Sequence, residues 1–367
     1  MSNYRRIIGR ALGSFILLVA EFSFSSYQLE EIAGNLSNPW SVAQLPNGDF
    51  LVTEKPGKLL QISAEGSIEI IAGTPKPFFK SQGGFFDVLP HPDFENNQLI
   101  FLSFAEGDHE ANRTTVISAR LSDSALSNVQ TILRVRPDKD TPAHYGGRLL
   151  FLPDGTLLVT TGDGFEYREA SQNIKSELGK VLRIGIDGTI PSDNPFSATE
   201  SAKIWTYGHR NPQGLAIKKE EGLVFLHEHG PKGGDEINIL TQGSNFGWPA
   251  ITYGVNYSGA MISPYTEAPG MEQPIHYWVP SIAPSGMAFY HGEQFPDWKG
   301  DLFIGALVDK EVRRLSLKGT EIIKEESVFE EVGQRVRDIR VFQDGYIYLL
   351  TDSDDEGRLI RIKPKLH

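Results

Sequence analysis

A β-hairpin is encoded by Gly146-Gly147-Arg148-Leu149-Leu150-Phe151-Leu152-Pro153-Asp154-Gly155-Thr156-Leu157-Leu158-Val159-Thr160. Two short apolar segments flank the turn Pro153-Asp154-Gly155, where proline fixes φ and glycine accepts a positive φ. Apolar segments around such a turn predict paired antiparallel strands. A further apolar segment, residues 179–184, follows a polar loop and extends the predicted sheet.

This order of segments recurs along the chain. Residues 40–62 repeat it around Pro46-Asn47-Gly48, and residues 337–362 repeat it around Gln343-Asp344-Gly345. Looser copies begin near three further residues, Gly83, Gln213 and Ser285. Six starts, about 45 to 70 residues apart, are typical of propeller blades. We therefore predict an all-β protein, a six-bladed β-propeller with four-stranded antiparallel blades. A β-sandwich, the alternative, would not repeat one unit six times.

The propeller is predicted to occupy residues 27–367 as one closed domain. Residues 244–280, rich in Gly, Tyr, Trp and Pro, are interpreted as a long insertion between two strands. Residues 1–26 have the features of a signal peptide, because three arginines precede the apolar run 15–20, which is too short to span a bilayer. We expect a periplasmic or secreted protein without stable membrane insertion; the alternatives are a short uncleaved anchor and a disordered tail.

The composition excludes several kinds of site. The chain of 367 residues has a formal net charge of −12, which argues against nucleic acid or an anionic membrane as a partner, since both favour basic surfaces. It contains no cysteine, which excludes disulfides, thiolate catalysis, iron–sulfur clusters and cysteine zinc sites.

Polar residues occupy matching positions in successive repeats. A propeller gathers the equivalent loops of its blades around one end of its axis, so these residues are expected to form one ring. The loops after the apolar strands contain Asp163 and residues 227–231. The strand starts, or the turns just before them, contain Gln82, His144, Arg210, Asn211, Ser281, Arg335 and Arg337.

Two of these residues form a candidate acid–base pair. His144 precedes the strand start at Gly146, and Asp163 follows the strand predicted to pair with it. A histidine next to a carboxylate is often only a structural hydrogen bond. Because this pair is predicted at the axial face, we interpret His144 as a general base whose tautomer Asp163 fixes.

The segment around residues 227–238 is a candidate metal site. His227 and His229 have the spacing of zinc ligands on one strand face, but no third ligand is evident. Exposed carbonyls in this glycine-rich loop, together with the carboxylates of Asp235 and Glu236, suit Ca²⁺ better. A plain turn with solvated charges is the remaining interpretation.

The arginines predict an anionic ligand. Arg335 and Arg337 alternate along one predicted strand, and Arg210 approaches the axis from another blade. Taken alone, Arg210 and Asn211, held between Gly208 and Pro212, read as a surface turn. Three guanidinium groups around one axis are unfavourable unless an anion neutralises them, so we expect a small polyanion.

Seven motifs resemble the soluble quinoprotein aldose sugar dehydrogenases of the glucose/sorbosone dehydrogenase family, collinearly from about Asn38 to Ile362. They are Gly83-Gly84-Phe85 with His91-Pro92-Asp93-Phe94, residues 144–148, 207–214 and 229–238, Asn245-Phe246-Gly247-Trp248-Pro249, residues 284–290, and residues 333–338. The resemblance implies a six-bladed propeller that binds pyrroloquinoline quinone (PQQ) with Ca²⁺, oxidises a small-molecule aldose and passes electrons to an external acceptor.

The resemblance also implies roles for individual residues. His144 matches the base that takes the proton of the sugar C1 hydroxyl, while hydride leaves C1 for the PQQ C5 carbon and the sugar becomes a lactone. Arg210 matches the group that polarises the C5 carbonyl. Further matching positions are Asn211, Ser281, Arg335 and Arg337 as cofactor contacts, Gln82 as a lining residue, and the carbonyls of Gly230 and Pro231 as ligands of the PQQ-bound Ca²⁺.

One position departs from the family pattern. Val308 stands where the family often places a cofactor-binding lysine, and Lys310 lies two residues further on. This departure leaves two other functions open beside the quinoprotein dehydrogenase. They are a calcium-dependent propeller lactonase or hydrolase, which would use axial carboxylates, and a sugar-binding propeller that has lost PQQ.

Overall fold

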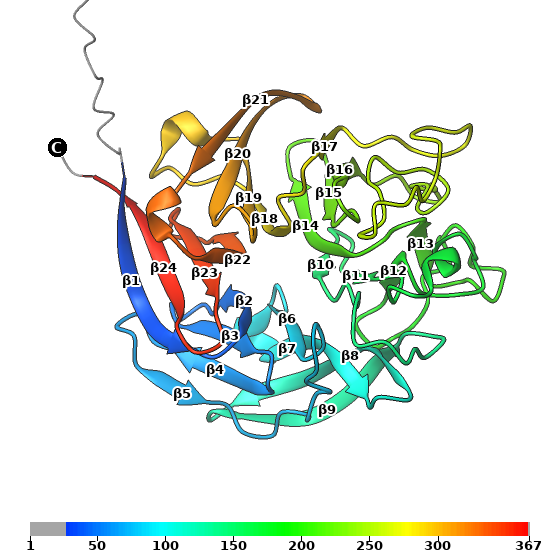
Figure 1. Ribbon diagram of the computed structural model, residues 1–367. Coiled ribbons are helices and arrows are strands. Elements are labelled where there is room, and N and C mark those ends of the chain that lie inside the picture. Colours follow the sequence, from blue (N-terminus) through cyan, green and yellow to red (C-terminus); the bar gives the residue numbers. More distant parts are fainter. Residues whose placement is uncertain (1–26, 366–367) are drawn as a thin grey trace, which may run out of the picture.

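The structure, a computed structural model, describes residues 27–365, and these fold into six four-stranded antiparallel sheets arranged in a ring (Figure 1). The predicted six-bladed propeller is therefore confirmed. The predicted signal peptide, residues 1–26, lies outside the described residues. No helix within residues 27–365 has the length and apolar character needed to cross a membrane.

Each blade has its first strand at the axis and its fourth at the rim, except that the last blade takes its rim strand from the N-terminus. The blades, from the axis outward, are β2 (Pro39–Gln44), β3 (Phe50–Glu54), β4 (Lys58–Ile62) and β5 (Ile68–Ile70); β6 (Phe85–Pro90), β7 (Leu99–Gly107), β8 (Asn112–Ser122) and β9 (Ala125–Arg134); β10 (Leu149–Phe151), β11 (Leu157–Thr161), β12 (Lys180–Ile184) and β13 (Ile204–Tyr207); β14 (Pro212–Lys218), β15 (Leu223–Glu228), β16 (Asp235–Ile239) and β17 (His276–Trp278); β18 (Pro284–Phe289), β19 (Leu302–Ala306), β20 (Glu311–Lys318) and β21 (Glu321–Val328); and β22 (Arg335–Val341), β23 (Ile347–Asp352), β24 (Gly357–Pro364) and β1 (Tyr27–Leu36). Four short helices lie in the loops: α1 (Phe94–Asn97), η1 (Arg168–Ser171), η2 (Pro296–Trp298) and η3 (Glu330–Val332).

The turns that predicted the hairpins have the expected local geometry. At Pro153-Asp154-Gly155 the Gly155 amide donates to the Leu152 carbonyl at 3.0 Å, and Gly155 has φ of 80°. The corresponding glycines Gly48 and Gly345 have φ of 92° and 77° and donate to residues three positions earlier. A side chain at this backbone conformation would be strained, so glycine sets these reversals.

Two sequence boundaries differ from the prediction. The innermost strand of the third blade begins at Leu149 rather than Gly146, because Gly146 and Gly147 have φ of 64° and 92°, outside the extended region. The predicted insertion at 244–280 runs between β16 and β17, and its end, residues 276–278, is the rim strand of the fourth blade.

The hydrophobic core is divided among the blade interfaces. One buried cluster joins Val42 and Phe50 of the first blade to Tyr348 of the last, and comparable clusters fill the other interfaces. Because strands such as β3 and β11 are buried along their full length, both faces of a blade pack against neighbours. The continuous apolar runs of these middle strands follow from that two-sided burial.

The axis is occupied by buried charges instead of apolar side chains. The Arg148 guanidinium, 2% exposed, lies 3.2 Å from both Asp87 Oδ1 and Asp338 Oδ1. Arg340 completes the cluster through Asp87 Oδ1 and Asp338 Oδ2, each at 3.0 Å. Four charged side chains from three blades thus neutralise one another at the centre of the ring, and Arg148 also stacks over Trp40 of a fourth.

We expect Arg148→Met to destabilise the fold by about 3 kcal/mol, because the two buried carboxylates would then share one guanidinium. Equilibrium urea unfolding measures the change. Arg134→Met is the matched control, since Arg134 forms a largely exposed pair with Glu106 and its loss costs less than about 1 kcal/mol. Equal losses in the free energy of unfolding would show that the axial cluster stabilises the fold no more than an exposed ion pair does.

Candidate active site

The residues of the predicted ring come together at one end of the axis, where the innermost strands begin. The Gln82 side chain accepts a hydrogen bond from the His144 amide at 2.8 Å. The Asp163 amide donates to the Arg210 carbonyl at 2.7 Å, and the Gly146 amide donates to Asn211 Oδ1 at 3.2 Å. Loops of the second, third and fourth blades are therefore directly connected at this point.

His144 and Asp163 form a buried pair. His144 Nδ1 lies 2.6 Å from Asp163 Oδ1, and the two side chains are 4% and 1% exposed. Asp163 Oδ1 also accepts the Phe165 amide, while Oδ2 accepts the indole N–H of Trp248 at 2.8 Å. Since an ionised carboxylate only accepts hydrogen bonds, Nδ1 of His144 must carry the proton. Nε2 is then the basic nitrogen.

The surroundings set the charge of this pair. Burial lowers the pKa of His144 below 6.5, and the hydrogen bond and charge of Asp163 offset only part of that effect. Burial acts to raise the pKa of Asp163, but the hydrogen bond and charge of His144 outweigh it, so the pKa falls below its usual range. At neutral pH the pair is a neutral imidazole held by a carboxylate, which is the state a general base requires.

Arg210 lies beside this pair and is tied to the glycine-rich loop. Its Nη1 donates to the carbonyls of His229 at 3.0 Å and Gly230 at 2.5 Å. Its guanidinium carbon is 5.4 Å from the Trp248 ring centroid. Contacts within the fourth blade therefore fix this buried cation, and the indole that contacts it also holds Asp163 of the third blade.

Arg335 and Arg337 converge on a carboxylate that the sequence prediction missed. Asp352 Oδ2 lies 3.0 Å from Arg335 Nε and 3.1 Å from Arg337 Nη2. The register of β22 and β23 shifts between Val336 and Asp338, so the two arginines do not simply alternate along a regular strand. The guanidinium groups are partly neutralised by Asp352, whose pKa is lowered by them despite its burial. Arg337 Nε is buried and has no hydrogen-bond partner in the described protein.

The glycine-rich loop is held by Asp235. Its Oδ1 accepts the Gly230 amide at 2.8 Å and Ser281 Oγ at 3.1 Å, and its Oδ2 accepts the Ala283 amide at 2.9 Å. The sequence predicts Asp235 as a metal ligand; in the structure its carboxylate connects two loops through these hydrogen bonds. Ser281 also accepts the Gly233 amide at 3.2 Å, so both residues fix the direction of the loop carbonyls.

Glu236 has few partners for a buried carboxylate. It faces Glu228 across β15 and β16, and its one hydrogen bond, from Asn238, measures 3.3 Å. Burial and the charge of Glu228 raise its pKa to about 8. Within residues 27–365 no cluster of three or more His, Cys, Asp or Glu side chains has metal-binding geometry. The His227 and His229 pair thus lacks the third such ligand that zinc needs, and a cation site here must include carbonyl oxygens.

A cavity of about 630 Å³ opens between the glycine-rich loop and the fifth blade. Its wall includes Gly230, Pro231 and Ser281, with Tyr257 and Val308 on the outer side. Val308 is 56% exposed and adds no charge, and Lys310 is not among the lining residues. Lys310 therefore does not take the place of a lysine at position 308 in this structure.

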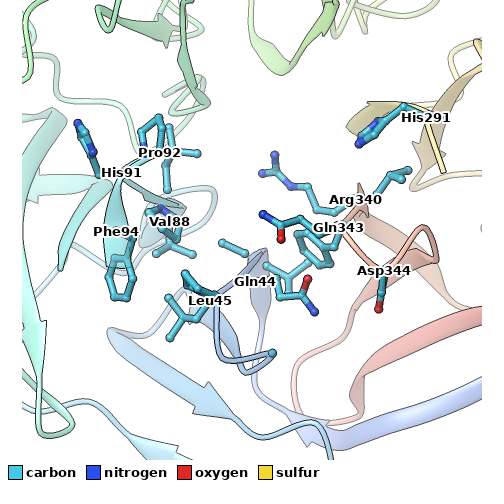
Figure 2. A pocket seen from close by; sticks show the side chains of 18 of the residues that line it. Gln44, Leu45, Val88, His91, Pro92, Phe94, His291, Arg340, Gln343 and Asp344 are labelled. Carbon is cyan, nitrogen blue, oxygen red and sulfur yellow. The ribbon is translucent and has the colours of Figure 1, made fainter. Parts of the chain in front are cut away.

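A second cavity, of about 560 Å³, lies at the opposite ends of the innermost strands (Figure 2). Gln44, Val88, Arg340, His91 and His291 are among the residues that line it. The guanidinium group of Arg340 is already paired with Asp87 and Asp338. None of the residues of the predicted ring lines this cavity, which separates it from the candidate active site.

The chemistry of the ring defines a class of site: a propeller pocket with one neutral base, several fixed cations and a carbonyl-rich loop. Comparison with known proteins agrees with this class. The Glucose / Sorbosone dehydrogenase family model matches residues 36–361. Aldose sugar dehydrogenase YliI of Escherichia coli strain K12 is 40% identical over 351 residues, covering 93% of this chain and 94% of that protein.

Solved structures give the same result. The apo-form of the soluble aldose sugar dehydrogenase from Escherichia coli superposes with a TM-score of 0.89 at 40% identity, covering 92% of this chain and 100% of the other. The PQQ-bound aldose sugar dehydrogenase from Streptomyces coelicolor gives 0.75 at 25% identity, covering 92% and 98%. The protein belongs to the glucose/sorbosone dehydrogenase family.

We expect Asp163→Asn to lower the pKa of His144 further, because the carboxylate both accepts from Nδ1 and stabilises the imidazolium. An NMR titration of the ¹³C-labelled Cε1 of His144, assigned with His144→Gln, measures the shift. Asp187→Asn, in an exposed turn of the same blade, should leave the titration unchanged. A rise in the pKa after Asp163→Asn would mean that the carboxylate does not support the charged ring.

Proposed function

We propose that the protein oxidises aldose sugars at C1 to the lactone, using PQQ with Ca²⁺, and passes the electrons to an external acceptor. The observation that carries the proposal is the buried His144–Asp163 pair beside Arg210. Export to the periplasm or the medium, as residues 1–26 suggest, is part of the same proposal. The sugar specificity implied by the names of the relatives is carried over here as an inference.

The residues of the pocket suit an anionic, oxygen-rich cofactor. Arg335 and Arg337 share the single carboxylate of Asp352, and the Arg210 guanidinium donates to backbone carbonyls, with no carboxylate in ion-pair distance within the described residues. Arg337 Nε and His229 Nε2 are buried polar atoms without partners in the described protein, and such atoms are costly unless a ligand satisfies them. PQQ carries three carboxyl groups and quinone oxygens, so Arg335, Arg337, Asn211, Ser281 and Gln82 are the residues proposed to hold it.

The carbonyls of Gly230 and Pro231 are proposed to ligate Ca²⁺. The Pro231 carbonyl has one contact, a long one of 3.5 Å from Ser281 Oγ. The Gly230 carbonyl already accepts Arg210 Nη1, but a carbonyl oxygen has two lone pairs and retains one for a cation. The carboxyl groups of Asp235 and Glu236 lie in the same segment, and a bound divalent cation would favour the ionised form of Glu236, whose pKa is raised to about 8 without one.

The protein's own groups would carry out the proton chemistry. His144 takes the proton of the C1 hydroxyl at Nε2, while Asp163 holds the ring in the required tautomer and stabilises its positive charge. Trp248 fixes Asp163 through its indole N–H. Arg210 provides a fixed positive charge that favours a developing oxyanion next to the base. When bound, PQQ would accept the two electrons and the hydrogen that leave C1 of the sugar.

Reconstitution tests the proposed activity. Protein purified without cofactor should gain aldose-dependent dye reduction when PQQ and Ca²⁺ are added, and His144→Ala should lower kcat by about 10³-fold because the base is lost. His291→Ala, at an exposed position away from the site, is the control and should retain full activity. Absence of any gain across a panel of aldoses would overturn the proposal. Ca²⁺-dependent lactone hydrolysis without quinone would favour a hydrolase instead.

Calcium removal tests the proposed metal loop. Chelation with EGTA should abolish the PQQ-supported activity and lower the thermal midpoint, since a cation bound only by the folded state stabilises it by about 2.7 kcal/mol at a hundred times its Kd. Differential scanning fluorimetry and dye reduction follow both effects, and added Ca²⁺ should restore them. Full activity in EGTA would remove Ca²⁺ from the proposal and leave the residues around His144 in place.

A further inference from the structure

Lys55 lies in the loop of the first blade that corresponds to functional loops in the others. It comes one residue after the second strand, β3, whereas Asp163 and Gly230 come two residues after β11 and β15. Val308 comes two residues after β19. The loops after these strands meet at the candidate active site, so the first blade contributes a lysine where the fifth contributes an uncharged side chain.

The contacts of Lys55 hold it next to a residue of the predicted ring. Its Nζ donates to the Ser81 carbonyl at 2.9 Å, next to Gln82, which contacts the His144 amide. The Lys55 carbonyl accepts the Phe85 amide at 3.0 Å, which anchors the backbone at the start of β6. No carboxylate lies within ion-pair distance of Lys55 in the described part of the chain, so its charge has no direct counterion.

Lys55 lies close enough to Arg335 and Arg337 for their charges to affect its pKa. Its pKa is lowered to about 8, mainly by burial and then by the charge of Arg337, with a smaller effect from Arg335. Asp352 and Asp354 act in the opposite direction, but Asp352 is already shared by both arginines. Three cations therefore face two carboxylates, which leaves a net positive charge for a ligand to neutralise.

We propose that Lys55 is a cofactor-binding residue that pairs with a carboxylate of PQQ and supplies from the first blade a charge that Val308 does not supply from the fifth. This inference rests on the proposed function, because it needs PQQ as the ligand. It assigns Lys55 a role that neither the sequence motifs nor the arginine pair indicates. The alternative is that Lys55 only tethers the loop at Ser81.

Equilibrium titration of PQQ into cofactor-free protein with Ca²⁺, followed by quenching of tryptophan fluorescence, tests the inference without turnover. Lys55→Met should weaken PQQ binding by about tenfold or more, since one positive charge close to an anion in a partly buried site is removed. Lys58→Met, at the exposed start of β4 in the same blade, is the matched control and should change Kd less than about twofold. Lys55→Arg should retain most of the affinity, because it keeps the charge.

A second substitution separates charge from tethering. Val308→Lys in the Lys55→Met background should recover most of the lost affinity, because it returns a cation to the cavity wall from another blade and does not reach Ser81. Recovery supports the charge role, and absence of recovery with a lowered thermal midpoint supports the tether. Unchanged PQQ affinity in Lys55→Met overturns this inference alone. A wild-type protein that binds no PQQ overturns the proposed function and this inference with it.

Discussion

The pairing of Arg148 with Asp87 and Asp338 is the interaction on which the arrangement of the blades depends. A buried guanidinium is tolerated only when carboxylates neutralise it, so the innermost strands of the second, third and sixth blades must meet at one place. Residues that precede these charges in the chain, such as His144 before Arg148 and Arg337 before Asp338, belong to the candidate active site. A shift of one blade would separate the charges at the axis and also move His144 or Arg337 away from the pocket.

The end of the axis that holds the candidate active site contains a neutral base on one side and a group of cations on the other. Around His144, burial and the hydrogen bond to Asp163 keep the ring neutral and its basic nitrogen defined. On the other side, Arg335 and Arg337 share the carboxylate of Asp352, and Lys55 lies close enough for the arginine charges to lower its pKa. One wall of the pocket is thus suited to accept a proton and the other to hold an anion. This division supports an oxidation in which a base and an anionic cofactor act on the same sugar.

Local signals in the sequence predicted the blades and part of the site. Turns such as Pro153-Asp154-Gly155 and their spacing were sufficient for the propeller, because each hairpin is specified by adjacent residues. The contact between Trp248 and Asp163 joins residues 85 positions apart through the long insertion, and no local pattern encodes it. Asp352 ends the apolar strand β23, and Asp163 comes two residues after the apolar strand β11. The sequence pattern that identified Asp163 could therefore also have identified Asp352. The hydrogen bonds of Asp235 could not be predicted from the sequence, because they depend on the positions of three donors from two separate loops.

The rim strand of the last blade gives the protein an unusual folding problem. β1 pairs with β24 from Tyr27 opposite Pro364 to Leu36 opposite Gly357, so the first and last described strands complete one sheet. Contacts of this sequence separation slow folding, because nearly the whole chain must be ordered before they form. The ring therefore closes only after β24 has been synthesised, and β24 has an open edge until β1 pairs with it.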